Sequence, residues 1–167
     1  MQITHPNTVL QPVSDADLVF LKQVYGSTRE EELKSTNWSD AQKKAFIEMQ
    51  FQAQHTAYSD YANAEFFLIV HESHQVGRVY LQYRPDAILI IDLALLAQFR
   101  GRGIGSGILN SIFAEARQLD KSVQIHVEKF NPALLLYQRL GFKLIIDKGV
   151  YLFLEWQDQA LSTAMAG

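Results

Sequence analysis

One glycine-rich stretch constrains more than any other what this chain can fold into. It lies between an apolar run over residues 87–96 and an amphipathic run over residues 104–119, which predicts a buried strand that turns directly into a helix. Glycine lets the backbone approach a ligand closely, and the first N–H groups of a helix have no partner within it. The stretch therefore predicts a site for a phosphate or pyrophosphate at the alternating glycines Gly101, Gly103 and Gly105.

The spacing of these glycines distinguishes between the known classes of phosphate loop. A P-loop places a Lys and a hydroxyl residue directly after its last glycine, and no Lys follows these glycines. The dinucleotide fingerprint needs a third glycine where Ser106 or Ile108 stands, which disfavours a Rossmann-like oxidoreductase. The remaining pattern, Gln98-x-x-Gly101-x-Gly103, resembles the pyrophosphate loop of the GNAT superfamily of acyl-CoA N-acyltransferases.

A second segment, residues 131–142, resembles the later motif of the same superfamily. In that motif an Asn begins a short helix that carries a Tyr and ends in Gly-Phe. The residues predict this helix independently, with Asn131 as its N-cap, Pro132 at its first position and Gly141 as its left-handed stop. The two motifs occur in family order and cover roughly residues 87–156, and the N-terminal half resembles the family much less specifically.

The resemblance implies a mixed α/β fold in which a central mixed sheet has helices on both faces. It further implies that the strand ending at Leu95 and the next strand splay apart, and that acetyl-CoA enters the gap as co-substrate. Main-chain groups of residues 93–95 would pair with the pantetheine arm, and residues 101–106 would hold the pyrophosphate. The expected cofactor-binding residues are Leu93, Leu95, Arg100, Gly101, Arg102, Gly103, Ile104, Gly105, Ser106, Asn131 and Tyr137.

Tyr137 matches the position of the family's general acid. A phenol with its ordinary pKa near 10 is protonated at neutral pH and can donate toward the departing CoA sulfur. The alternative is that Tyr137 only packs its helix on the sheet.

Two carboxylates are candidates for the base. Asp92 lies inside an apolar run, where a buried carboxylate costs several kcal/mol unless it is paired or protonated. It is either a base with a raised pKa or a structural partner of Arg78, Arg84, Arg100 or backbone N–H groups, and the residues favour the structural role. Glu128 either faces the cleft or is solvated at the end of its strand.

Composition bounds the other possibilities. The chain has 167 residues, 48% of them hydrophobic, which fits a single domain over residues 1–167 with a frayed tail at residues 158–167. It has no cysteine, and its histidines show no metal-ligand spacing, so we expect no metal. The net charge of −3 disfavours nucleic acid as the partner. No leader or long apolar run is evident, so we expect a cytoplasmic protein without a membrane partner.

The N-terminal half carries two predicted helices. The first begins at a cap on Ser14 and ends at Gly26, and residues 27–38 form a surface turn or short helix. The second begins at a cap on Ser39 and runs over residues 40–59. It has two apolar stripes. One consists of Phe46, Met49, Ala53 and Ala57, and the other of Ile47, Phe51 and Tyr58. We expect both stripes to be core, and the alternative is that one of them lines a substrate groove.

The other predicted elements follow from alternation and turn residues. A polar turn at residues 72–75 joins two strands as a hairpin. The expected strands are residues 8–11, 65–71, 76–83, 87–96, 123–128, 142–146 and 150–156.

The predicted function is N-acetyl transfer from acetyl-CoA to a primary amine by direct transfer in a ternary complex. The acceptor is a small-molecule amine, a peptide N-terminus or a lysine, and a homodimer is among the expected assemblies. The competing hypothesis is a CoA-binding sensor or partner-binding module with the same fold and little transfer activity. Tyr137 favours the enzyme, because a binder needs the glycines but not the acid.

Overall fold

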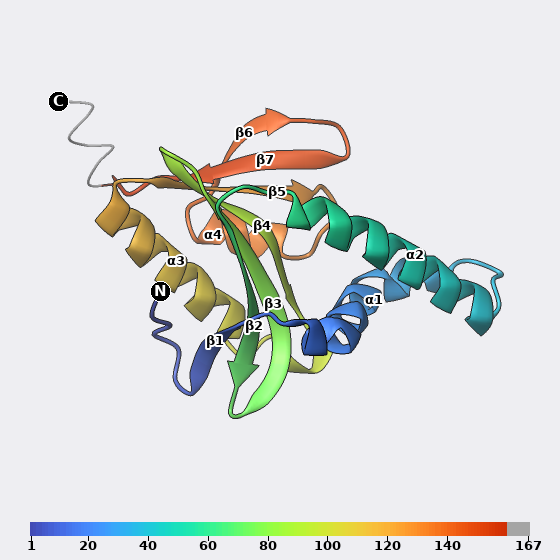
Figure 1. Cartoon of the computed structure of the whole chain (residues 1–167). Coiled ribbons are helices and arrows are strands. Elements are labelled where there is room, and N and C mark those ends of the chain that lie inside the picture. Colours follow the sequence, from blue (N-terminus) through green and yellow to red (C-terminus); the bar gives the residue numbers. More distant parts are fainter. Residues whose placement is uncertain (160–167) are drawn as a thin grey trace.

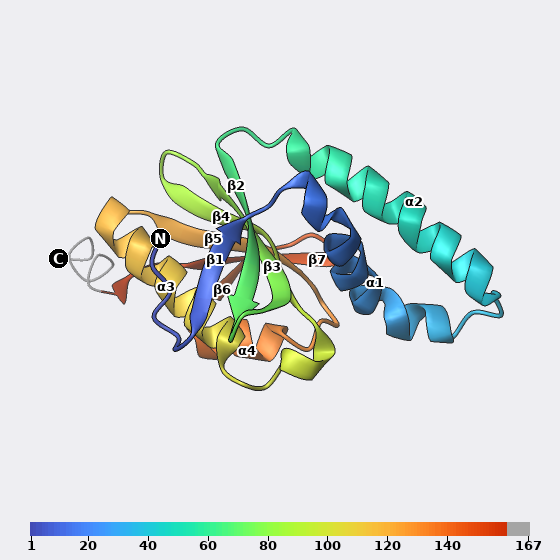
Figure 2. The same ribbon diagram turned by 60° about the horizontal axis from the view of Figure 1, so that its bottom comes forward.

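The computed structural model describes residues 1–159, which form one mixed sheet of seven strands in the order β1-β2-β3-β4-β5-β7-β6. The helices α1 and α2 form a hairpin that projects beyond one side of the sheet, and α3 lies on the opposite side (Figures 1 and 2). The strands are β1 Thr8–Pro12, β2 Ala64–His71, β3 His74–Tyr83, β4 Ala87–Leu95, β5 Ser122–Glu128, β6 Lys143–Asp147 and β7 Tyr151–Trp156. The helices are η1 Asp15–Asp17, α1 Leu18–Lys34, α2 Asp40–Ser59, η2 Ala97–Phe99, α3 Ile104–Leu119 and α4 Leu134–Arg139.

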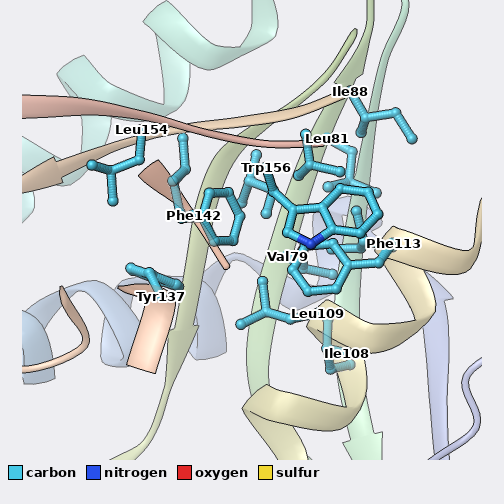
Figure 3. Packing of buried hydrophobic residues seen from close by; sticks show 14 of the residues in the cluster. Val79, Leu81, Ile88, Ile108, Leu109, Phe113, Tyr137, Phe142, Leu154 and Trp156 are labelled. Carbon is cyan, nitrogen blue, oxygen red and sulfur yellow. The ribbon is translucent and has the colours of Figure 1, made fainter. Parts of the chain in front are cut away.

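Alternation along the strands gives the sheet a separate core on each face. Leu68 and Tyr80 pack with α1 and α2 through Leu21, Tyr25 and Phe51. Their neighbours in sequence point to the opposite face, where α3 and α4 cover a larger core. There the ring of Trp156 stacks on Phe113 with centroids 4.2 Å apart, near Tyr137 and Phe142 (Figure 3). The predicted mixed α/β fold with helices on both faces is confirmed.

The prediction that Gly26 ends the first helix is wrong. Ser14 and Asp17 do cap the start, but α1 continues through Gly26 to Lys34 and includes most of the segment predicted as a surface turn or short helix. A helical glycine costs only about 1 kcal/mol relative to alanine, and burial of Leu33 in the last turn favours continuation. At Gly26 the two helices run close together, since a Cβ there would lie 3.5 Å from Ile47 Cγ2.

The helix α2 has the predicted bounds and the predicted cap, in which Ser39 accepts a hydrogen bond from the Gln42 N–H at 3.2 Å. The expectation that both of its apolar stripes are core is wrong. Phe51 is buried, with Ile47 and Tyr58 packed against the same cluster, whereas Met49 on the other stripe is 61% exposed. The hairpin projects from the sheet, so only one face of α2 meets it (Figure 1).

Two turns differ from the predictions. The hairpin between β2 and β3 turns over Glu72 and Ser73 alone, both with positive φ, as in the tight turns that suit strand twist. The prediction that Asn131 is the N-cap of its helix is wrong, because α4 begins only at Leu134 and its N-cap is Ala133. Asn131 and Pro132 lie in the preceding turn, where Asn131 Oδ1 accepts a hydrogen bond from the Ala133 N–H at 2.9 Å.

Within residues 1–159, no helix has the length and apolarity that crossing a membrane requires. The start of the predicted tail is held by an ion pair between Asp158 and Arg117 at 3.5 Å. The rest of that tail, residues 160–167, lies outside the described residues.

Candidate active site

The parallel strands β4 and β5 are paired over only part of their length. Their register runs from Ala87 opposite Ser122 to Ile90 opposite Ile125, although β4 continues to Leu95 and β5 to Glu128. On its other side, β4 stays paired with β3 as far as Leu95. The main chain of residues 91–95 therefore has no partner strand on its β5 side within residues 1–159. The predicted splay is present at the predicted place.

The glycine loop lies directly beyond this unpaired end of β4. Gly101 and Gly103 have φ values of +75° and +82°, which L side chains rarely adopt. The helix α3 then begins, and its first backbone bond runs from the Gly107 N–H to the Gly103 carbonyl at 2.9 Å. The N–H groups of residues 104–106 precede this bond and have no partner within the helix. They form a set of donors suited to a phosphate.

The two arginines of the loop differ in their contacts. The Nε of Arg100 donates to the Leu95 carbonyl at 3.0 Å, which ties the loop to the end of β4. The guanidinium of Arg102 lies over the Phe99 ring at 5.5 Å. Both residues are exposed.

Tyr137 comes from α4 and lies in the core beside the Phe142 ring, at a centroid distance of 5.7 Å. Burial and then the negative charge of Asp92 raise the pKa of Tyr137 to about 12. Within residues 1–159, every fully buried side-chain oxygen has a hydrogen-bond partner. No partner is found there for the Tyr137 hydroxyl, so this oxygen is not fully buried. With its raised pKa, the phenol is protonated at neutral pH.

Asp92 forms an ion pair with Arg78 of β3, whose residue is 2% exposed. The same guanidinium donates to Gln54 Oε1 of α2 at 2.8 Å. Burial is the largest single effect on Arg78 and opposes its charge, but Asp92, Tyr80 and Tyr58 together outweigh burial and raise the pKa of Arg78. Of the partners considered for Asp92, the structure pairs it with Arg78.

Glu128 lies at the end of β5 and is also paired. Its carboxylate is 3.5 Å from Arg29 Nη1 of α1, and its side chain is 40% exposed. Arg29 also contacts Glu32 at 2.9 Å and donates to the Tyr25 hydroxyl at 3.4 Å. These contacts connect the α1–α2 hairpin to the end of β5. Of the two candidate bases, Asp92 contributes to the raised pKa of Tyr137, whereas Glu128 pairs with Arg29 of α1.

Residues 62–144 match the family model of the acetyltransferase (GNAT) domain. The chain therefore contains a GNAT acetyltransferase domain. PaiA N-acetyltransferase from Thermoplasma acidophilum, solved in complex with coenzyme A, is 15% identical, with a TM-score of 0.69 over 90% of this chain and 99% of that one. An acetyltransferase from Thermus thermophilus is 20% identical, with a TM-score of 0.66 over 93% of this chain and 98% of that one. No curated protein matches the chain in sequence.

At these identities the likeness to solved structures shows a shared fold. The predicted superfamily and the GNAT fold are therefore confirmed, and the roles of individual site residues stay predictions. Within residues 1–159, no group of three or more His, Asp or Glu side chains is arranged to hold a metal ion.

Sequence analysis missed the contact between the N-terminal segment and the GNAT glycine loop. His5 packs on α3 with its Nε2 3.6 Å from the position of a Cβ at Gly103, and Thr4 N donates to Ser111 Oγ at 3.1 Å. Thr8 Oγ1 holds the ring in place, at 2.9 Å from His5 Nδ1 and 2.8 Å from His71 Nδ1. The available signal was the spacing of small residues on one face of α3, at Gly103, Gly107 and Ser111, which admits a close neighbour.

Proposed function

We propose that this chain transfers an acetyl group from acetyl-CoA to a primary amine, directly and within a ternary complex. One observation carries the proposal: the pairing of β4 with β5 ends at Ile90, and the unpaired end of β4 leads to a loop that presents unpaired helix N–H groups. An extended pantetheine arm can satisfy the main chain of residues 93–95 as an additional strand would. The GNAT acetyltransferase domain supports this interpretation, as does the coenzyme A in the PaiA relative.

The cofactor would be held mainly by main-chain groups. The N–H groups of residues 101–106 would bind the pyrophosphate at the positive end of the α3 dipole, with Arg100 and Arg102 adding charge. Leu93 and Leu95 would pair with the amides of the pantetheine arm. Asn131 would contribute to cofactor binding from the turn before α4, where its Oδ1 accepts a hydrogen bond from the Ala133 N–H.

In the proposed step the neutral amine nitrogen attacks the thioester carbonyl carbon. The new C–N bond forms, the C–S bond breaks, and the electron pair of that bond leaves on the CoA sulfur. Tyr137 would donate its phenolic proton toward this sulfur. A thiol has an ordinary pKa near 8.5, below that of Tyr137, so the phenol is best suited to a hydrogen bond that strengthens as charge develops.

The proton released by the amine would leave through water. The two candidate bases, Asp92 and Glu128, are each paired with an arginine. We therefore assign Asp92 and Glu128 to positioning the site and not to direct proton abstraction.

A panel of amines incubated with acetyl-CoA tests the proposed activity. Free thiol and acetylated acceptor should appear in equal amounts for at least one small amine, peptide N-terminus or lysine peptide. Calorimetric titration with acetyl-CoA on the same preparation provides the control. Binding without thiol release across the panel would favour the CoA-binding sensor, and absence of both would contradict the proposed cofactor site.

A further inference from the structure

The strand β6 forms one edge of the sheet and exposes three consecutive large apolar side chains. Leu144 is 56% exposed, Ile145 52% and Ile146 49%. The same hairpin exposes Val150 and Tyr151. Figure 1 shows β6 at the outer margin of the molecule, beyond β7. Edge strands of monomeric proteins are usually protected by charges, proline or a covering element, because an open apolar edge pairs with other chains.

The opposite edge of the sheet shows the usual protection. The strand β1 contains Pro12, which has no N–H to donate, and the polar Gln11. Val9 is its one strongly exposed large apolar residue, at 59%. The two edges of the same sheet therefore differ in apolar exposure, with three exposed large apolar residues in β6 and one in β1.

The sequence of β6 is complementary to itself in an antiparallel arrangement. Lys143-Leu144-Ile145-Ile146-Asp147 places a cation at one end and an anion at the other, with apolar residues between them. Two copies that run antiparallel about Ile145 bring each Lys143 opposite Asp147 of the other copy. The same register brings Leu144 opposite Ile146 of the other copy. Every cross-strand pair in that register is favourable.

We propose that β6 pairs antiparallel with β6 of a second copy, about a twofold axis at Ile145, and joins the two sheets into one. Such an interface is isologous, since the same residues serve both partners. The pairing of β6 with β7 shifts register between Leu144 and Ile146, so Ile145 has no partner residue on β7. Ile145 is thus the extra residue of a bulge, and its side chain is 52% exposed.

The charged ends of β6 are suited to this pairing. Lys143 forms no ion pair within residues 1–159. Asp147 is fixed by Lys129 at 2.9 Å and accepts a hydrogen bond from the Gly149 N–H at 2.9 Å. A positioned carboxylate therefore faces a lysine whose charge has no partner in its own copy.

The neighbouring surface can enlarge the interface. A specific interface buries about 1,000 Å² or more, which exceeds what one strand edge supplies. The Lys129 N–H donates to the Val150 carbonyl at 3.2 Å, so the turn after β5 lies against the tip of the hairpin. That turn carries Phe130, which is 96% exposed. With Val150 and Tyr151, it adds exposed apolar side chains at the turn end of the β6–β7 hairpin.

Sedimentation equilibrium on the full chain at micromolar concentration tests the proposal. The wild type should be a dimer. Ile145→Asp should raise the dimer dissociation constant at least about 100-fold, because it places two like charges against each other at the axis. Val9→Asp, at a similarly exposed position on β1, should leave the dimer intact. A monomeric wild type, or a dimer that survives Ile145→Asp, would overturn the proposal.

A charge exchange tests the register. Lys143→Asp should weaken the dimer by placing it opposite Asp147 of the other copy, and Lys143→Asp combined with Asp147→Lys should restore much of the affinity. Far-ultraviolet circular dichroism confirms that each variant is folded. A double variant no tighter than Lys143→Asp alone would refute the antiparallel register at Ile145.

Discussion

The proposed reaction depends most on the phenol of Tyr137, which is held in the core by α4 and has a pKa raised to about 12. Tyr137→Phe keeps the ring and its contact with Phe142 and removes only the hydroxyl. We expect CoA affinity to stay near normal and turnover to fall by about 100-fold or more, as is typical when a general acid is lost. Calorimetry and steady-state kinetics on the same preparation measure both. Unchanged turnover would reduce Tyr137 to a packing residue.

The raised pKa of Tyr137 also predicts a feature of the pH profile. The folded protein holds this proton more tightly than the unfolded chain, so the phenol remains protonated past pH 10, the ordinary pKa of tyrosine. Ionisation of Tyr137 should therefore cause no fall in turnover near pH 10. Any fall that is observed there should persist in the Tyr137→Phe variant. A descending limb there that depends on Tyr137 would contradict the pKa and its assigned cause.

The pair of Asp92 and Arg78 is expected to support the site through its structure. Asp92→Asn leaves a guanidinium that is 2% exposed without its anionic partner, and breaking a buried pair costs about 3 to 5 kcal/mol. We expect denaturant unfolding to show this loss, while the folded fraction keeps its turnover and its ascending pH limb. Asp86→Asn, in an exposed turn, is the matched control and should change stability by less than about 0.5 kcal/mol. A stable but inactive Asp92→Asn protein would instead make Asp92 the base.

At the scale of elements, we expect alanine substitutions at two helical glycines to change the stability of the protein in opposite directions. Replacing glycine with alanine inside a helix gains about 1 kcal/mol when there is room for the methyl group. At Gly26 the new Cβ would lie 3.5 Å from Ile47, an ordinary contact, so Gly26→Ala should stabilise the protein. At Gly107 it would lie 2.6 Å from the Cβ of His5, so Gly107→Ala should destabilise it by displacing the N-terminal segment. Urea unfolding of both variants gives the signs, and equal signs would contradict this packing.

The elements differ in how well the sequence predicts them. The bounds of α3, Ile104–Leu119, are predicted correctly, because the glycine loop before the helix and the strong apolar stripe along it agree with each other. The end of α1 is predicted wrongly at Gly26, because a single glycine indicates a helix end only when no buried helix face continues beyond it. The burial of the α2 stripe that contains Phe46 and Met49 is predicted wrongly for another reason. Phe46 and Met49 have a core-like spacing, but no sequence rule shows that the hairpin projects from the sheet.

At the scale of the molecule, each motif of the proposed cofactor site is formed by residues that are close in sequence. The residues that surround this site come from distant parts of the chain. The glycine loop and the Asn131 turn each lie within a dozen residues, so their motifs predict them. The partner of Asp92 depends on the register of β3 against β4, and that of Glu128 on where α1 crosses the end of β5. His5 reaches α3 only because β1 begins at the same end of the sheet as the glycine loop. Such contacts depend on topology, which single-sequence patterns do not specify.

The central claim is that acetyl-CoA binds where β4 and β5 part, with its pyrophosphate on the first turn of α3. Hydrogen exchange with and without CoA, resolved to short peptides, tests it without altering the chain. The amides of residues 93–95 and 101–106 should exchange more slowly with CoA bound, while those of β1, at the far edge of the sheet, should not change. Protection that is absent from these two segments at saturating CoA, or confined to other elements, would contradict the account.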